Sequence, residues 1–254
     1  MAADEIEHPF QFSLGGFWNE VDATVASTPN GFDKVELDLD RLGLDDRATI
    51  FWSEGTWRFT ERWSANLSYS QFSSDGLAEA TADGVYEDIE WEAGAALATD
   101  FGIGLAIANI TWDFVSTDRT RAGIGLGVHT ANLEFDITAS ARIETSEGVF
   151  EEVVETTGND LLAPLPNVAL TASHEFTDNL RLLGYLGYFS LSYDDYDGTL
   201  VSTRVALEWF PWENVGFGGA LQYVDVELEI EQSRRVDDYE VALFGPIAYA
   251  TFRF

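Results

Sequence analysis

The sequence predicts an all-β fold: a closed antiparallel transmembrane β-barrel of about 12 strands, with 14 strands as the alternative. Three observations predict it. Apolar and polar residues alternate in long runs, no stretch is apolar enough for a membrane-spanning helix, and the chain ends on a strand with phenylalanine at positions 252 and 254. Alternation with a period of two is typical of a strand with one apolar face. Runs of about ten residues cross a bilayer at a tilt, and in hydrocarbon only a closed sheet pairs every backbone group. We therefore expect a single domain, residues 1–254.

The alternating runs give each strand in order. In one of them Trp63, Leu67 and Tyr69 share a face, while Ser64 and Ser68 take the other. An even number of strands returns the C-terminus to the side of the N-terminus. The predicted strands are 9–24, 47–59, 63–73, 87–99, 102–115, 121–131, 133–145, 164–176, 180–193, 199–210, 215–231 and 239–254.

The connections also alternate in length, as they do in membrane barrels. Short segments flanked by aromatic residues predict turns on one side, at 59–63, 99–102, 176–180 and 210–214. Longer polar segments predict loops on the other, outer side, at 73–84, 145–160, 194–198 and 232–238.

Two regions do not fit this plan simply. In segment 33–46, Val35, Leu37 and Leu39 alternate with acidic residues. We interpret it as a hairpin extension on the outer side, with an inward-folded segment or a further strand of a 14-stranded barrel as alternatives. Near Tyr223 the apolar face changes phase, which indicates a bulge or the exit of the strand from the membrane.

The last strand carries a resemblance to a known family. Phe252 and Phe254 share one face and the chain stops there. This ending resembles the terminal strand of bacterial outer-membrane β-barrels, in which a C-terminal phenylalanine forms part of the assembly signal. Residues 36–45, followed by 57–59, are also similar to uncharacterised proteobacterial outer-membrane proteins.

The resemblance implies a location in the outer membrane of a Gram-negative bacterium. It implies outer-membrane lipids and the barrel-assembly machinery as partners, with Phe252 and Phe254 as the assembly signal, and it implies no activity. The first residues, 1–5, lack the basic start and apolar core of a signal peptide and look like the start that cleavage leaves.

The chain is strongly acidic. It holds 45 Asp and Glu against 13 Lys and Arg, a net charge of -32, which argues against nucleic acid as a partner. It has no cysteine and three histidines, and no cofactor motif is present. The acidic residues 225, 227, 229 and 231, with others in 147–155, make the outer side negative. We interpret these as a solvated acidic surface and predict no metal site.

If the apolar faces meet lipid, charged residues on the other faces line a lumen. We expect it to be lined by Glu90, Glu92, Glu134, Asp136, Arg142, Arg204 and Glu208. An acidic lining attracts cations, so the sequence predicts a small porin-like diffusion channel that transports hydrophilic solutes with a preference for cations. The alternative is that arginine and glutamate side chains pair and fill the barrel.

Two other functions stay open. A lipid-modifying barrel enzyme needs a nucleophile with an activating base, and His129 is the one histidine whose strand face suits a lumen. Ser173 and His174 are adjacent on a strand and point to opposite faces. We therefore assign no catalytic residues, metal or cofactor. The third function is a structural or adhesive barrel with a plugged lumen and acidic loops that contact a partner.

Overall fold

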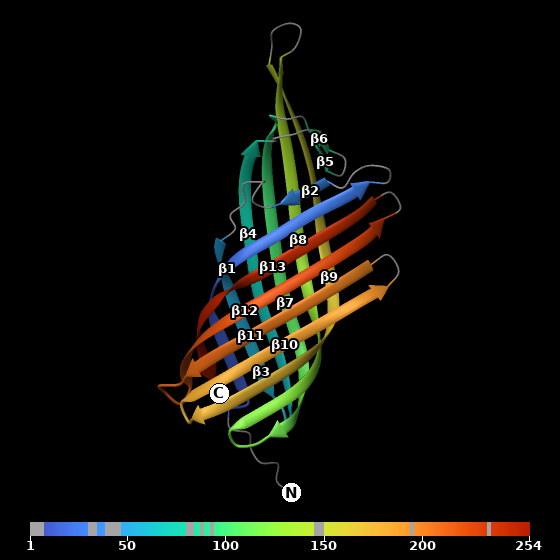
Figure 1. Ribbon diagram of the computed structural model, residues 1–254. Helices are drawn as coiled ribbons and strands as arrows, with labels where there is room; N and C mark the ends of the chain where they lie inside the picture. The colour runs from blue at the N-terminus through green and yellow to red at the C-terminus, as the bar shows by residue number, and fades with distance from the viewer. Residues whose placement is uncertain are drawn as a thin grey trace.

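The computed structural model describes residues 8–29, 35–38, 47–79, 84–86, 89–91, 94–144, 150–193, 196–232 and 235–254. Over these residues the chain is a closed antiparallel β-barrel, much longer than it is wide (Figure 1). In this part of the chain no helix is long and apolar enough to cross a membrane.

Ten of the described strands form the barrel wall. In wall order each pairs antiparallel with the next, and the last pairs with the first and closes the ring. They are β1 (Phe10–Pro29), β3 (Arg47–Arg58), β4 (Trp63–Glu79), β7 (Ala96–Ser116), β8 (Thr120–Glu144), β9 (Phe150–Thr177), β10 (Leu180–Tyr193), β11 (Tyr196–Trp209), β12 (Val215–Gln232) and β13 (Arg235–Arg253).

Three short strands lie outside the wall. β2 (Val35–Asp38) pairs with the outer end of β1, which is the hairpin extension that the sequence favours. β5 (Gly84–Tyr86) and β6 (Ile89–Trp91) pair only with each other.

The predicted count of 12 strands, and the alternative of 14, are not confirmed. Two expected breaks do not exist, because β7 runs unbroken through residues 99–102 and β8 runs unbroken past Asn132. Asp100 and Gly102 lie within the first third of β7 and pair with strands on both sides. The strands are longer than a bilayer requires, so polar residues and glycine occur within them where the sequence suggests a turn.

The outward face has the pattern of a membrane-spanning barrel, an apolar band between two rings of aromatic residues. The ring near the short turns contains Trp57, Trp63, Trp112, Phe176 and Trp209, and the ring at the other end of the band contains Trp18, Phe51, Tyr69, Tyr188, Tyr223 and Phe244. Leucine and valine side chains lie exposed between the rings, among them Leu170 and Leu207. Past Tyr223 the outward residues of β12 become acidic without any shift of register. The phase change there is therefore the exit from the band.

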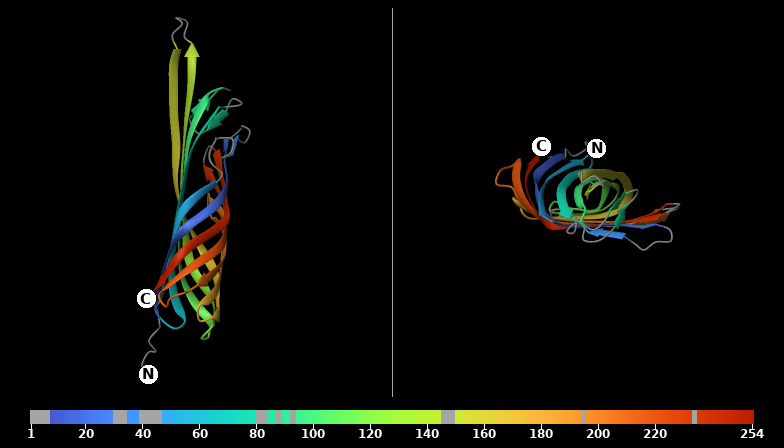
Figure 2. Two further views of the ribbon diagram at one scale, coloured as in Figure 1. Left: turned by 90° about the vertical axis from the view of Figure 1, so that its left-hand side faces the viewer. Right: turned by 90° about the horizontal axis from the view of Figure 1, so that it is seen from above.

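Beyond the band the wall divides into two sheets. Pairing between β3 and β4 stops at Phe51 and Gln71, and pairing between β9 and β10 stops at Val168 and Tyr188. The strands β4, β7, β8 and β9 continue as one sheet, and β1 with β10 to β13 continue as the other. Figure 2 shows the two groups diverging, with the β8–β9 hairpin reaching furthest.

The barrel interior as the candidate functional site

The outer half of the interior is mainly apolar, with Asn19, Thr99 and His129 as buried polar side chains. Phe17, Leu200, Leu243 and Ile247 of one sheet and Phe72 of the other are each less than 2% exposed. The two sheets approach each other at Gly198. At Gly198 of β11, a Cβ would lie 3.4 to 3.7 Å from side-chain carbons of Leu228, Leu165 and Phe189, which belong to three other strands. This half is therefore packed as the core of a two-sheet sandwich is.

The half nearer the short turns is filled by charged pairs. Asp113 Oδ2 accepts hydrogen bonds from Arg58 Nη1 at 3.0 Å and from Arg121 Nη1 at 3.4 Å. In the next group Arg181 Nε donates to Glu208 Oε2 at 3.0 Å. Glu208 Oε1 accepts from Tyr249 Oη at 3.0 Å.

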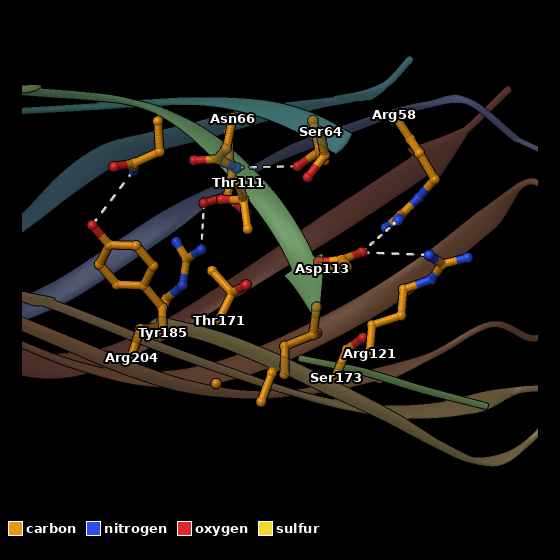
Figure 3. Close-up of a pocket in the computed structure, with 16 residues that line it drawn as sticks. Arg58, Ser64, Asn66, Thr111, Asp113, Arg121, Thr171, Ser173, Tyr185 and Arg204 are labelled. Atoms are coloured by element: carbon orange, nitrogen blue, oxygen red, sulfur yellow. Dashed lines mark hydrogen bonds and ion pairs between the residues drawn. The ribbon is translucent and has the colours of Figure 1, made fainter. Parts of the chain in front are cut away.

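A third group lies higher in the interior. Arg204 pairs with Glu54 and also lies 5.1 Å from the centre of the Trp52 ring. Next to it, the Tyr185 hydroxyl accepts a hydrogen bond from Asn167 Nδ2 at 3.1 Å. Figure 3 shows that Arg58 and Arg121 approach Asp113 from two sides, with Arg204 and Tyr185 at the other end of the group.

Three glycines on the inner face of β8 make room for these polar side chains. A Cβ at Gly123 would lie 2.7 Å from Asp113 Oδ1, and one at Gly127 would lie 2.1 Å from Asn109 Oδ1. Gly125 has the same relation to Thr111 at 2.8 Å. The polar side chains of β7 therefore lie over the glycines of β8, and larger residues at these β8 positions would displace them.

A cavity of about 140 Å³ remains inside this polar half. Its wall includes Arg58, Arg121, Ser173, Tyr185 and Arg204. A wider space of about 510 Å³ shares Arg58, Arg121 and Ser173 with it and is also lined by residues of the short turns. Together they form a polar recess that opens at the turn end and stops at the apolar half.

The predicted lumen residues divide between the two faces of the wall. Arg204 and Glu208 point into the barrel. Glu134 and Asp136 lie on the outer face, which corrects their predicted place in the lumen. Glu134 pairs directly with Gly102 and lines a groove of about 240 Å³ on that face, with Tyr69 on the groove's other side. The side chains of Glu90 and Arg142, and the whole of Glu92, lie outside the described residues.

The phase of β8 explains this correction. Gly123 and His129 are buried and face inward, so even-numbered residues of the same unbroken strand face outward. The sequence prediction placed a break near Asn132 and restarted the phase there. The residues that it missed are Glu54, Arg58, Asp113, Arg121 and Arg181, which stand on inner faces near the turn ends of strands. Alternation along each strand could have placed these side chains on the inner face, although it does not show which of them pair.

The interior is not acidic over the described residues. Arg58, Arg121, Arg181 and Arg204 supply four guanidinium groups, and Glu54, Asp113 and Glu208 supply three carboxylates. Arg253 and Glu175, partly exposed at the mouth, add one charge of each sign, so these groups together carry one positive charge in excess. The acidic lining on which the expected cation preference depends is therefore not found among the described inner side chains.

His129, the candidate base of a lipid-modifying enzyme, is 1% exposed and faces the interior. Ser140, a hydroxyl on the same strand that such a base would need as its partner, lies on the opposite, outer face of β8, where it donates to the Ala96 carbonyl at 3.4 Å. Ser173 lines the cavity, whereas the exposed His174 contacts Thr120 Oγ1 at 2.8 Å. Within the described residues no group of three or more His, Asp and Glu side chains is arranged to hold a metal ion.

The residues of the expected assembly signal lie at the seam of the barrel. Phe252 pairs with Phe12 of β1. Phe254, at 65% exposure, exchanges two backbone hydrogen bonds with Phe10, at 2.8 and 3.3 Å. The described chain therefore closes its ring with its last residue.

No protein-family model matches the chain, and no curated protein matches it. Among solved structures, the outer membrane protease OmpT from Escherichia coli is similar with a TM-score of 0.60 and 14% identity, covering 99% of both chains. OprG from Pseudomonas aeruginosa gives a TM-score of 0.41 and 12% identity, over 98% of this chain and 97% of that one. Ail of Yersinia pestis gives 0.32 and 11%, over 98% and 100%. The likeness to OmpT shows that the chain has the fold of a bacterial outer-membrane β-barrel.

Proposed function

We propose that this protein is a non-conducting outer-membrane barrel that holds a long acidic β-structure beyond the membrane, where it contacts a cationic partner. The observation that carries the proposal is the packed apolar interior of the outer half. Phe17, Phe72 and Leu243 fill the path that a solute would take after leaving the polar recess. Such cores are packed as densely as organic crystals, so a hydrated solute passes only if several large side chains move.

The charged pairs narrow the other half, although a polar recess remains between them. Each carboxylate is held by at least one guanidinium, and Glu208 by Arg181 and Tyr249 together. Breaking a buried pair of this kind leaves a charge uncompensated and costs about 3–5 kcal/mol. A passing ion would have to replace these contacts one after another.

The part of β1, β12 and β13 beyond the apolar band, called the extension below, has an acidic outward face. This face supports the proposed contact with a cationic partner. On β12 and β13, Glu227 stands directly opposite Glu240. Glu227 and Glu240 are exposed, as is Asp22 on the neighbouring β1. Like charges directly opposite each other destabilise a sheet. A face that keeps them is suited to a partner that brings positive charge, such as a basic protein segment or a polyamine.

Conduction is tested by inserting the purified protein into planar bilayers at 1 M and 0.1 M salt. We expect no reproducible current steps at either salt concentration. Insertion is checked in the same preparation by protease protection of the barrel in liposomes. Defined current steps from inserted protein would overturn the proposal and favour the diffusion channel.

The proposed contact with a cationic partner is tested by measuring how tightly the protein binds to polylysine-coated beads. A triple variant, Asp22→Asn with Glu227→Gln and Glu240→Gln, removes three charges from the extension. The control triple, Glu61→Gln with Glu175→Gln and Glu213→Gln, removes three from the turn end. We expect the first to weaken binding at least tenfold more than the second, and salt to weaken binding because the Debye length is about 10 Å at 0.1 M. Equal weakening by both triples would contradict a partner site on the extension.

The diffusion channel remains the second candidate, and the polar recess favours it because water reaches the middle of the barrel from the turn end. If current steps appear, the excess of one arginine among the described inner charges predicts a weak preference for anions rather than cations. The lipid-modifying enzyme gains no support from His129, since its ring is enclosed within the barrel.

A further inference from the structure

The arginines of this acidic chain are concentrated at the turn end of the barrel. Of 13 Lys and Arg residues in the sequence, five line the mouth of the recess: Arg58, Arg119, Arg121, Arg181 and Arg253. The same mouth also carries acidic residues, namely Glu61, Asp118, Glu175, Asp178 and Glu213. All of these except Glu175 are exposed at the rim, while Arg58, Arg121 and Arg181 are only partly exposed and lie further in. The positive charge is therefore greatest at the inner end.

We propose that this recess binds a small oxyanion, presented as a carboxylate or a phosphate group, that enters from the turn end. The site is the space around Arg58 and Arg121. The proposal goes beyond the closed barrel argued above, since it requires only that the recess is open at one end.

The arrangement around Asp113 gives the site its unbalanced charge. Two guanidinium groups share one carboxylate oxygen, Asp113 Oδ2, at 3.0 and 3.4 Å. Arg181 and Glu208 neutralise each other, as do Arg204 and Glu54. At Asp113 itself, two guanidinium groups therefore face one carboxylate, and the partly exposed Glu175 lies further along the recess, opposite Arg181.

Arg58 and Arg121 keep N–H groups that can donate further hydrogen bonds. A guanidinium group has five N–H groups in a planar fork. Arg58 donates through Nη1 to Asp113, and Arg121 donates through Nη1 to Asp113, to Ser116 and to the Glu61 carbonyl. Nε and Nη2 of both side chains make no hydrogen bond to the described residues. Planar pairs of N–H groups match the two oxygens of a carboxylate or phosphate.

Neutral donors complete the lining. The hydroxyl groups of Ser64, Thr171 and Ser173 belong to the cavity wall beside the two arginines. The cavity of about 140 Å³ has room for about four to five water molecules at about 30 Å³ each. A carboxylate or phosphate group with little attached to it is the anion that this volume takes.

The test uses the whole folded protein in detergent micelles and isothermal titration calorimetry at low ionic strength. Sodium acetate, succinate and inorganic phosphate are titrated separately, with sodium chloride as the reference salt. We expect at least one oxyanion to bind at least tenfold more tightly than chloride. Whether a carboxylate or phosphate binds more tightly identifies the oxyanion group that the recess prefers. No oxyanion binding above that of chloride would overturn the proposal.

Matched variants locate the site. Arg121→Gln removes an inner charge, and Arg119→Gln removes the same charge from the rim, where Arg119 pairs with Asp178 at 3.2 Å. We expect the first to weaken binding at least tenfold and the second less than twofold. Similar losses in both would show a diffuse electrostatic effect and overturn the site.

Folding is checked by the shift in electrophoretic mobility on heating. If Arg121→Gln fails to fold, Arg58→Gln takes its place, because it leaves Arg121 and Asp113 as a neutral pair. Bilayer current does not bear on this result, so the two proposals fail separately.

Discussion

The two halves of the barrel interior are filled by side chains of opposite character. Near the short turns the filling is charged: Asp113, Glu54 and Glu208 each hold an arginine. Beyond the band the filling is apolar, with Phe17, Phe72 and Leu243 between two sheets. The outward faces reverse this order, since they are apolar at the band and acidic beyond it. A strand thus exchanges the polarity of its two faces as it leaves the membrane band.

The exchange follows from what surrounds each part. In the band the outer face meets hydrocarbon, so charged groups are accommodated inside, where partners are available. Beyond the band water lies outside, so the apolar residues turn inward as in a soluble sandwich. The change on β12 between Tyr223 and Val224 marks this boundary in a single strand.

The largest expected change in stability comes from a substitution in the apolar half. Phe72→Ala should lower the free energy of unfolding by roughly 3–5 kcal/mol, because it opens a cavity between the two sheets. Urea unfolding in lipid vesicles, followed by tryptophan fluorescence, measures it. The control is Leu77→Ala on the same strand, where the side chain is 79% exposed and the cost should stay below about 1 kcal/mol. Equal costs would mean that the outer half is not packed.

The next effect concerns the charged half. Arg181→Leu should cost about 3 kcal/mol, because it leaves Glu208, at 3% side-chain exposure, without its cation. Adding Glu208→Leu to that variant should recover most of the loss, since no lone charge remains. The same unfolding measurement applies to both variants. If the double variant is as unstable as the single one, this half depends on packing rather than on charge compensation.

A polar side chain on the apolar side gives a smaller effect of opposite sign. Asn19 is 3% exposed, and neither its Oδ1 nor its Nδ2 has a hydrogen-bond partner in the described residues. Asn19→Leu should therefore raise the free energy of unfolding by about 1–2 kcal/mol. Asn167→Leu is the comparison, and it should lower stability because Asn167 donates to Tyr185. A loss in both variants would show that Asn19 is satisfied by water.

The smallest effect lies on the outer face of the same extension. Glu240→Lys replaces a repulsive pair with Glu227 by an attractive one. We expect a gain of about 0.2–1 kcal/mol at low salt, seen as a rise in the urea midpoint that fades at 1 M salt. A gain that is independent of salt would point to a cause other than charge.

The sequence was sufficient for the class of fold but not for the inner face. Alternation along the strand that holds Trp63, Leu67 and Tyr69 predicted its outward residues correctly, and the aromatic-flanked turns at 59–63 and 210–214 are where they were expected. The strand count was too high, because Asp100 and Gly102 have turn chemistry in a strand that water surrounds. The inner arginines were missed for a related reason. Which of them share a carboxylate depends on strand tilt and register, and alternation along single strands does not contain that information.

The seam between the first and last strands has a consequence for how the molecule forms. Every other wall contact joins neighbouring strands of the chain or strands separated by a short excursion, whereas Phe10 meets Phe254 across nearly the whole chain. Bringing ends this far apart together costs on the order of 5 kcal/mol in chain entropy, taken as (3/2)RT ln n, so the ring closes after the hairpins have formed. Until then both edge strands expose a row of unpaired backbone groups, the state in which a sheet is open to wrong partners. The protein is therefore most exposed to mispairing before its ring closes, and the stability of the finished wall does not protect it at that stage.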